Sequence, residues 1–127
     1  MNQLLKKINK KKVKVGIIGL GYVVLPLVKL FVKNKIEVLG VDLDNDKIKK
    51  LQAGDSYISS NNLKDFQYFK FKKKNVSQKY KILKNADIIL ICLPTPLKKL
   101  RPDMSFLYDC AKKLSLLNLK DKMIILE

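Results

Sequence analysis

Short apolar runs alternate with a longer amphipathic run at the start of the chain. Residues 13–18 (VKVGII) and 36–41 (IEVLGV) are rich in Val and Ile and predict two strands. Between them, residues 22–33 are apolar at most positions, as in a helix packed on a sheet, and Pro26 near its start removes little hydrogen bonding. A strand-helix-strand order of this kind predicts an α/β fold with parallel strands.

The second half repeats this alternation. Residues 86–93 (ADIILICL) form an uninterrupted apolar run that is typical of a central parallel strand. Residues 103–117 predict a helix, and 123–126 (MIIL) predict the start of another buried strand. Helical spacing places five apolar residues on one side of that helix: Phe106, Leu107, Cys110, Ala111 and Leu114. An alternative is that 123–126 is an edge strand closing a small domain.

The middle of the chain carries weaker patterns. Asp44 is placed to cap a helix over 45–52, and Gly54 lies just past its end. Beyond it we expect a polar loop (56–62), a short helix (63–69), an edge strand (70–77) and one or two helical turns (79–84).

Residues 1–12 (MNQLLKKINKKK) are basic and precede the first strand. We expect a frayed, solvated lead-in, with a short basic amphipathic tail as the alternative. The stretch has no apolar core of the signal-peptide kind. The longest uncharged run, 15–28, is shorter than the ~20 residues that span a bilayer. The sequence therefore predicts a cytoplasmic protein with no membrane partner.

The net charge of +16 would ordinarily indicate a nucleic-acid partner. Arg101 is the only arginine among 27 basic residues, however, and arginine is the better reader of phosphates and bases. We therefore expect a lysine-coated surface and no nucleic acid. The alternative is a basic nucleic-acid-binding module built on lysines 70–74 with interleaved aromatic residues that could stack on bases, namely Phe66, Tyr68, Phe69 and Phe71.

Residue types also exclude some chemistries. The chain has no histidine, which excludes histidine metal sites and Ser-His-Asp triads, and we expect no metal. Cys92 and Cys110, its only cysteines, do not make a disulfide scaffold. Both fall on predicted core positions, so we expect packing roles for them rather than nucleophilic ones.

Gly19-Leu20-Gly21 follows the first predicted strand and opens the first predicted helix. This is where a G-x-G-x-x-G turn binds the phosphates of a dinucleotide, with the helix N-terminus behind them. Asp42 ends the second strand at about the spacing expected of an acid that binds a ribose hydroxyl, and it favours NAD over NADP. Each residue alone could belong to any strand-helix turn. Together they predict dinucleotide binding by a Rossmann-like, doubly wound parallel sheet over 13–127. No helix follows the predicted buried strand at 123–126 to cover it, so we expect the sheet to be incomplete at its C-terminal end.

Four segments resemble the UDP-glucose/GDP-mannose dehydrogenase family, and most of all its UDP-N-acetylhexosamine 6-dehydrogenase branch. They are KVGIIGLGYVVLPL (14–27), GVDLDNDKIKKLQAG (40–54), ADIILICLPTPL (86–97) and PDMSFLYDCAKKL (102–114). The resemblance implies that 13–127 is the NAD-binding front part of a longer enzyme that oxidises a UDP-sugar to its uronic acid for polysaccharide precursors. It also implies eight cofactor-binding residues: Gly19, Leu20, Gly21, Tyr22, Val23, Asp42, Lys47 and Thr95.

The same resemblance implies two hydride transfers to NAD through a cysteine-linked intermediate. That cysteine belongs to a later part of the family's sequence, so we expect no catalytic residue here, no catalysis by this piece alone, and a homo-oligomer only through the missing region. Val24 replaces the third glycine of the motif and should weaken NAD binding by overpacking between helix and strand. An inert remnant without ligand is the remaining alternative.

Overall fold

A single parallel sheet organises the chain. The computed structural model describes residues 2–55 and 67–127. Its five-stranded sheet has the order β3-β2-β1-β4-β7, and all four pairings are parallel. The strands are β1 (Lys14–Ile18), β2 (Glu37–Val41), β3 (Val76–Ser77), β4 (Ile88–Ile91) and β7 (Met123–Leu126). This order, with the first strand in the centre, is that of a doubly wound dinucleotide-binding sheet and confirms the predicted fold class.

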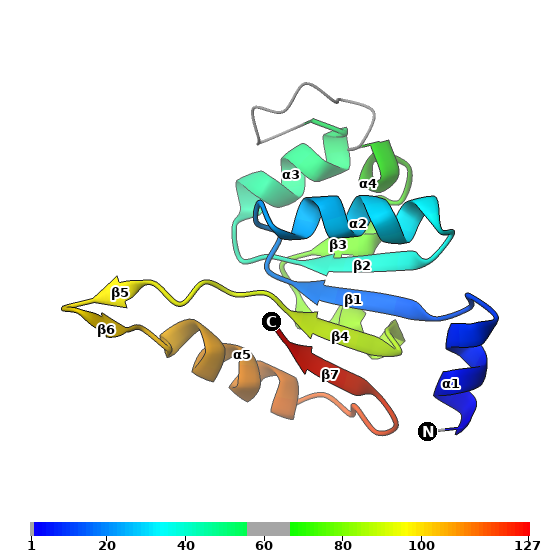
Figure 1. The fold of residues 1–127 in the computed structure, drawn as a ribbon. Coiled ribbons are helices and arrows are strands. Elements are labelled where there is room, and N and C mark those ends of the chain that lie inside the picture. The colour runs from blue at the N-terminus through cyan, green and yellow to red at the C-terminus, as the bar shows by residue number, and fades with distance from the viewer. Residues whose placement is uncertain (1, 56–66) are drawn as a thin grey trace.

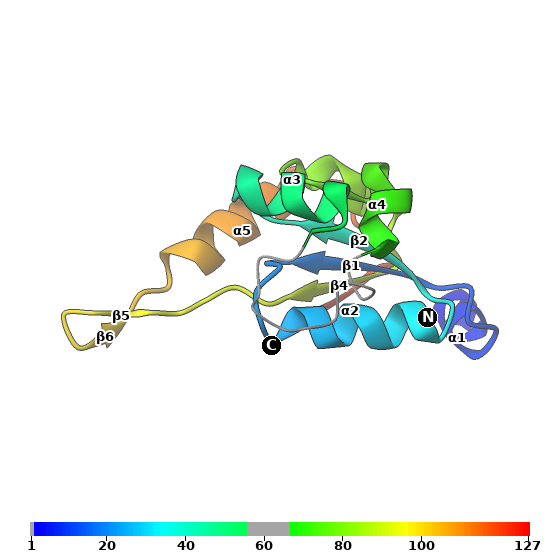
Figure 2. The ribbon, with the colours of Figure 1, turned by 90° about the horizontal axis from the view of Figure 1, so that it is seen from above.

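Helices cover both faces of the sheet. One apolar cluster joins the sheet to α2 (Val24–Lys33), α3 (Asn45–Ala53) and α4 (Gln67–Phe71). A second cluster joins the other face to the 3-10 helix η3 (Tyr80–Asn85) and to α5 (Ser105–Ser115). Figure 2 shows α2 and α5 on opposite sides of the strands. The central strands β1 and β4 are therefore buried on both faces, which explains their continuous apolar sequences.

The ends of α3 follow the sequence expectation closely. The Asp44 carboxylate caps the helix by accepting the N–H groups of Asp46 at 2.9 Å and Lys47 at 3.2 Å. Gly54 follows the last turn with φ of +80°, the left-handed conformation that glycine adopts most easily. The two residues fix the length of the helix that follows β2.

The structure after α3 differs from the edge strand predicted over 70–77. The edge strand expected over 70–77 exists only as Val76 and Ser77, because a helix (α4) and a 3-10 turn η2 (Lys73–Asn75) occupy most of that range. The Tyr68 hydroxyl accepts the N–H of Val38 at 2.9 Å, which ties α4 to β2. The loop predicted over 56–62, and most of the helix predicted over 63–69, lie outside the described residues.

The N-terminus also differs from the expectation of a frayed lead-in. Residues Asn2–Asn9 form a helix, α1, which lies near the amino-terminal ends of the strands in Figure 1. Leu4 is buried, and the Lys7 ammonium forms an ion pair with Asp87 at the start of β4. The apolar side of α1 and this ion pair explain why the segment is helical rather than frayed.

Strand β7 ends the described sheet, and helix α5 buries fewer residues than predicted. Strand β7 pairs with β4 but lies at the edge of the sheet, and Ile124, Ile125 and Leu126 are exposed. The predicted strand is confirmed, and it is the outermost strand of the described sheet on the β4 side. Only Cys110 and Leu114 of the predicted α5 stripe are buried, whereas Phe106 and Ala111 are exposed.

A small hairpin projects from the carboxyl end of the sheet (Figure 1). Its strands are β5 (Leu97–Lys98) and β6 (Arg101–Pro102), joined by Lys99 and Leu100. Both linking residues have positive φ, as a tight two-residue hairpin turn requires. No helix of the described residues is long and apolar enough to cross a membrane.

Asp87 joins α1 to the sheet, and this gives a pH prediction. Partial burial raises the pKa of Asp87, but hydrogen bonds from Lys7 and from the Lys14 N–H outweigh it, so the pKa lies below its usual value. A lowered pKa stabilises the fold above the unfolded-state pKa of about 3.9, and the contribution is lost as the pH falls through the folded-state pKa.

We expect Asp87→Asn to lower the free energy of unfolding at pH 7 by about 1 kcal/mol. The difference from the parent should shrink as the pH falls below about 4. Urea unfolding at both pH values measures it. Asp121→Asn is the matched control, since Asp121 lines the same surface cavity. A deficit in Asp87→Asn that stayed constant with pH would contradict the ion-pair account.

Candidate functional site

The turn after β1 passes very close to the end of β4. The φ angle of Gly19 is +92°, and a Cβ built on it would lie 2.4 Å from the carbonyl oxygen of Cys92. The Gly19 N–H donates to the carbonyl of Val41 at 2.8 Å, which ties the turn to the end of β2 as well. Only glycine fits at this position, because any side chain would collide with the backbone.

Gly21 has the opposite environment. A Cβ built on it would meet no heavy atom within 4 Å, so the space above this glycine is open. Helix α2 begins three residues later, and no side chain caps its N-terminus. N–H groups of a first helical turn have no acceptor within the helix, and they carry the positive end of the helix dipole. The turn thus offers an anion an open approach to backbone donors.

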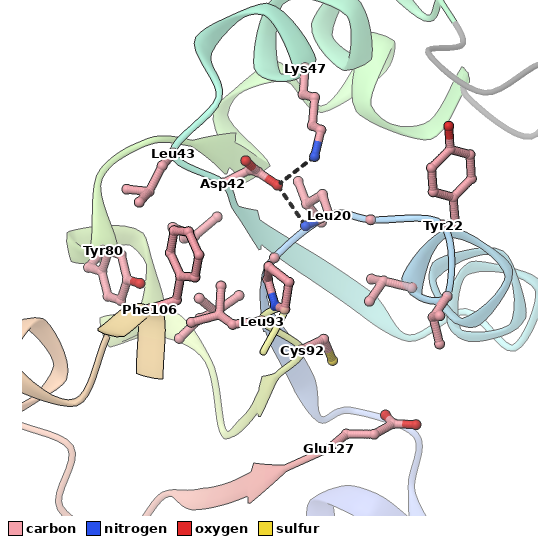
Figure 3. Close-up of a pocket in the computed structure, with 17 residues that line it drawn as sticks. Leu20, Tyr22, Asp42, Leu43, Lys47, Tyr80, Cys92, Leu93, Phe106 and Glu127 are labelled. Carbon is pink, nitrogen blue, oxygen red and sulfur yellow. Dashed lines mark hydrogen bonds and ion pairs between the residues drawn. The ribbon is translucent and has the colours of Figure 1, made fainter. Parts of the chain in front are cut away.

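Asp42 lies beside this turn, directly after β2. Its side chain is 11% exposed and bonds to backbone on both sides. One carboxylate oxygen accepts the Leu20 N–H at 2.8 Å, and the other accepts the Asp44 N–H at 2.9 Å. The Lys47 ammonium lies 3.7 Å from the oxygen that Leu20 contacts (Figure 3). The carboxylate is therefore held in a fixed orientation at the edge of the turn.

These residues open into one cavity of about 590 Å³ at the carboxyl ends of the strands. Seven of the eight predicted cofactor-binding residues line it: Gly19, Leu20, Gly21, Tyr22, Val23, Asp42 and Lys47. Thr95 is exposed and does not line it, whereas Leu93 and Pro94 just before it do. Within the described residues, no group of His, Cys, Asp or Glu could hold a metal ion.

The cavity also has an apolar end that the sequence analysis did not assign. Leu43, Tyr80, Leu93 and Phe106 gather on the side of Asp42 away from Tyr22 (Figure 3). Burial and a hydrogen bond with the Cys110 thiol raise the pKa of Tyr80, so its hydroxyl stays neutral. These residues come from four separate segments, and no local spacing in the sequence links them.

The two cysteines are free thiols with little nucleophilic character. Burial raises the pKa of Cys92 and of Cys110, which keeps both protonated. Cys110 is fully buried on α5, in agreement with a packing role. Cys92 is only partly buried and lines the cavity, close to Glu127. The sequence analysis did not predict a position in the cavity for either residue.

Val24, at the third motif position, is the first residue of α2. Its side chain is 2% exposed and belongs to the core cluster beneath that helix. The fold thus accommodates the branched side chain in the core. Its effect on cofactor affinity stays a prediction.

The aromatic residues among the lysines do not form an exposed stacking surface where the structure describes them. Phe69 is 2% exposed, and Tyr68 is half-buried with its hydroxyl bonded to β2. Phe69 is therefore not available for stacking on bases, and Phe66 and the side chain of Phe71 lie outside the described residues.

Comparison with known proteins places this geometry in a family. The model of the UDP-glucose/GDP-mannose dehydrogenase family, NAD binding domain, matches residues 13–127. A UDP-N-acetyl-D-mannosamine dehydrogenase of Pyrococcus horikoshii is 26% identical over 116 residues, covering 90% of this chain and 28% of that protein. One of Methanococcus vannielii is 35% identical over 91 residues, covering 71% of this chain and 21% of that protein.

Solved structures agree. The UDP-D-ManNAc dehydrogenase of Pyrococcus horikoshii superposes with a TM-score of 0.79 at 26% identity, over 90% of this chain and 28% of that one. The UDP-N-acetyl-mannosamine dehydrogenase of Staphylococcus aureus gives 0.76 at 28% identity, with the same coverage. The chain thus spans less than a third of the length of these relatives. The matched domain is an NAD-binding one, which confirms the predicted cofactor.

The two glycines of the turn should respond differently to an added methyl group. Gly19→Ala should lower the free energy of unfolding by about 2–4 kcal/mol, because the left-handed backbone and the Cys92 carbonyl both oppose a Cβ. Gly21→Ala should change it by less than about 1 kcal/mol, yet weaken NAD binding, because its Cβ fills the open space over the turn. Urea unfolding and NAD titration measure the two effects. Equal stability losses in both variants would contradict this assignment.

Proposed function

Because this chain belongs to the UDP-glucose/GDP-mannose dehydrogenase family, we propose that it is the NAD-holding part of a nucleotide-sugar 6-dehydrogenase. The observation that carries the proposal is the cavity at the carboxyl ends of four parallel strands. The segments after β1, β2, β4 and β7 all line it. Ligands of open α/β sheets bind in this crevice, where the strand order changes direction.

The residues present fit a dinucleotide. The Gly19–Gly21 turn and the N-terminus of α2 suit the two phosphates, since Gly21 leaves the space above the turn open. Asp42 suits the ribose diol: a carboxylate offers about four acceptor positions, and backbone N–H groups use one on each oxygen. The apolar end formed by Leu43, Tyr80 and Phe106 suits the adenine ring.

The opposite part of the cavity, near Cys92 and Glu127, is left for the nicotinamide end. Bound NAD would supply a hydride acceptor there. The described residues supply no thiolate at neutral pH, because burial keeps the thiol of Cys92 protonated. We propose that the nucleophile and the sugar-binding groups lie in the part of the enzyme that corresponds to the length of the relatives not spanned by this chain.

Relatives of this chain are UDP-N-acetyl-D-mannosamine dehydrogenases, so we propose a UDP-N-acetylhexosamine as substrate of the complete enzyme, with UDP-glucose as the second candidate. The product would be the uronic acid, a polysaccharide precursor. We place the reaction in the cytoplasm, since both cysteines are free thiols, as is usual in a reducing compartment.

Titration calorimetry of the full 127-residue chain with NAD and NADP tests the proposal. We expect NAD to bind about tenfold or more tightly than NADP, because the Asp42 carboxylate repels a 2′-phosphate. Single-stranded DNA at physiological salt is the control ligand. Salt-sensitive DNA binding without NAD binding would favour the nucleic-acid alternative, and binding of neither would favour an inert remnant.

Val24 gives a second test of the same site. Glycine at this position should tighten NAD binding, because the α2 N-terminus could then approach the strand more closely. It should also lower the free energy of unfolding by about 2–3 kcal/mol, since Val24→Gly removes a buried side chain and places glycine in a helix. NAD titration and urea unfolding measure both. Equal NAD affinities in the parent and in Val24→Gly would refute the predicted weakening.

A further inference from the structure

We infer that Asp42 is a positioning residue for the phosphate-binding turn as well as a ligand for ribose. This inference rests on the proposed function and deepens it. A ribose ligand needs only to reach the sugar. Asp42 instead bonds directly to the turn: its carboxylate accepts the Leu20 N–H at 2.8 Å (Figure 3).

Leu20 is the middle residue of the turn, so holding its backbone orients the glycines on either side. Its side chain is fully buried. It packs against β2 so closely that a Cβ on Gly40 would lie 3.0 Å from it. The Asp42 bond fixes the backbone of the same residue on the open side. Leu20 is thus held by its side chain, which packs on β2, and by its N–H, which donates to the Asp42 carboxylate.

The carboxylate is itself immobilised, which a positioning role requires. Its second oxygen accepts the Asp44 N–H at 2.9 Å, and Lys47 on α3 lies 3.7 Å from the first oxygen. Its side chain is only 11% exposed, so water competes little for these bonds. Asp42 therefore connects the turn after β1 to the start of α3, and the phosphate and ribose subsites share one fixed group.

A ligand without the ribose diol distinguishes positioning of the turn by Asp42 from binding of ribose by Asp42. An NAD analogue with a 2′,3′-dideoxyadenosine half keeps both phosphates and lacks the diol that Asp42 would bind. If Asp42 binds only ribose, Asp42→Ala should weaken NAD binding and leave binding of the analogue unchanged. If Asp42 also positions the turn, Asp42→Ala should weaken binding of the analogue by about tenfold. Removing a negative charge alone would strengthen binding of an anion, so such a loss has no simple charge explanation.

The experiment measures calorimetric affinities for NAD and the dideoxy analogue in the parent chain, in Asp42→Ala and in Asp46→Ala. Asp46 is the matched control, an exposed acid of the same helix start that does not contact the turn. It should leave both affinities within about twofold. Amide exchange of Leu20 by NMR is the second readout, and it should become about tenfold faster in ligand-free Asp42→Ala.

Each outcome decides one point. Weaker analogue binding together with faster Leu20 exchange supports the inference. Unchanged analogue binding with weaker NAD binding overturns it and leaves the proposed function intact. Absence of NAD binding by the folded parent chain overturns the proposed function and the inference with it. If Asp42→Ala loses its cooperative thermal transition, Asp42→Leu replaces it, since leucine fills the space and offers no acceptor.

Discussion

The close approach of Gly19 to the carbonyl of Cys92 determines the architecture of the whole carboxyl edge. With β1 in the centre of the sheet, its turn has to leave between the ends of β2 and β4. The Gly19 N–H bonds to the β2 carbonyl of Val41, and the absent side chain lets Cys92 follow β4 at contact distance. Because the turn is held on both sides, α2 starts at the end of β1, where the strand order changes direction between β2 on one side and β4 on the other. The open space over Gly21 and the anchored Asp42 carboxylate are consequences of that constraint.

Most of the sheet was predictable from the sequence because its signals are local. The apolar runs at 13–18, 36–41 and 86–93 contain β1, β2 and β4, and Asp44 and Gly54 bound α3 as their residue types predict. Each of these signals depends on backbone conformation within a few residues or on burial from both faces of a sheet. The glycine turn was equally readable, since a left-handed glycine after a strand is a local requirement.

The misses have a common cause in tertiary contacts. Helix α1 depends on an ion pair between Lys7 and Asp87, which are distant in sequence. Residues 70–75 (KFKKKN) could have formed a strand, but α4 and η2 occupy this range, and the Tyr68 hydroxyl bond to β2 holds α4 against the sheet. The apolar end of the cavity likewise draws Tyr80 and Phe106 from separate segments. By spacing, Phe106 belongs to the apolar stripe of α5 that was predicted to pack on the sheet. It lines the cavity instead, because the start of α5 lies beside the carboxyl end of the sheet and not over its face.

The strongly basic composition and the cavity are largely independent of each other. Among 27 basic residues, Lys47 is the only one in the described part of the chain that lines this cavity, and it lies 3.7 Å from the Asp42 carboxylate. Affinity for a dinucleotide must therefore come mainly from backbone N–H groups and shape, whereas the surface lysines act through long-range attraction that salt screens. This division explains how a lysine-rich chain can keep a site suited to NAD. Apart from Lys47, the cavity is lined by glycines, the carboxylates of Asp42 and Glu127, and mostly apolar side chains, none of which contributes to the positive charge.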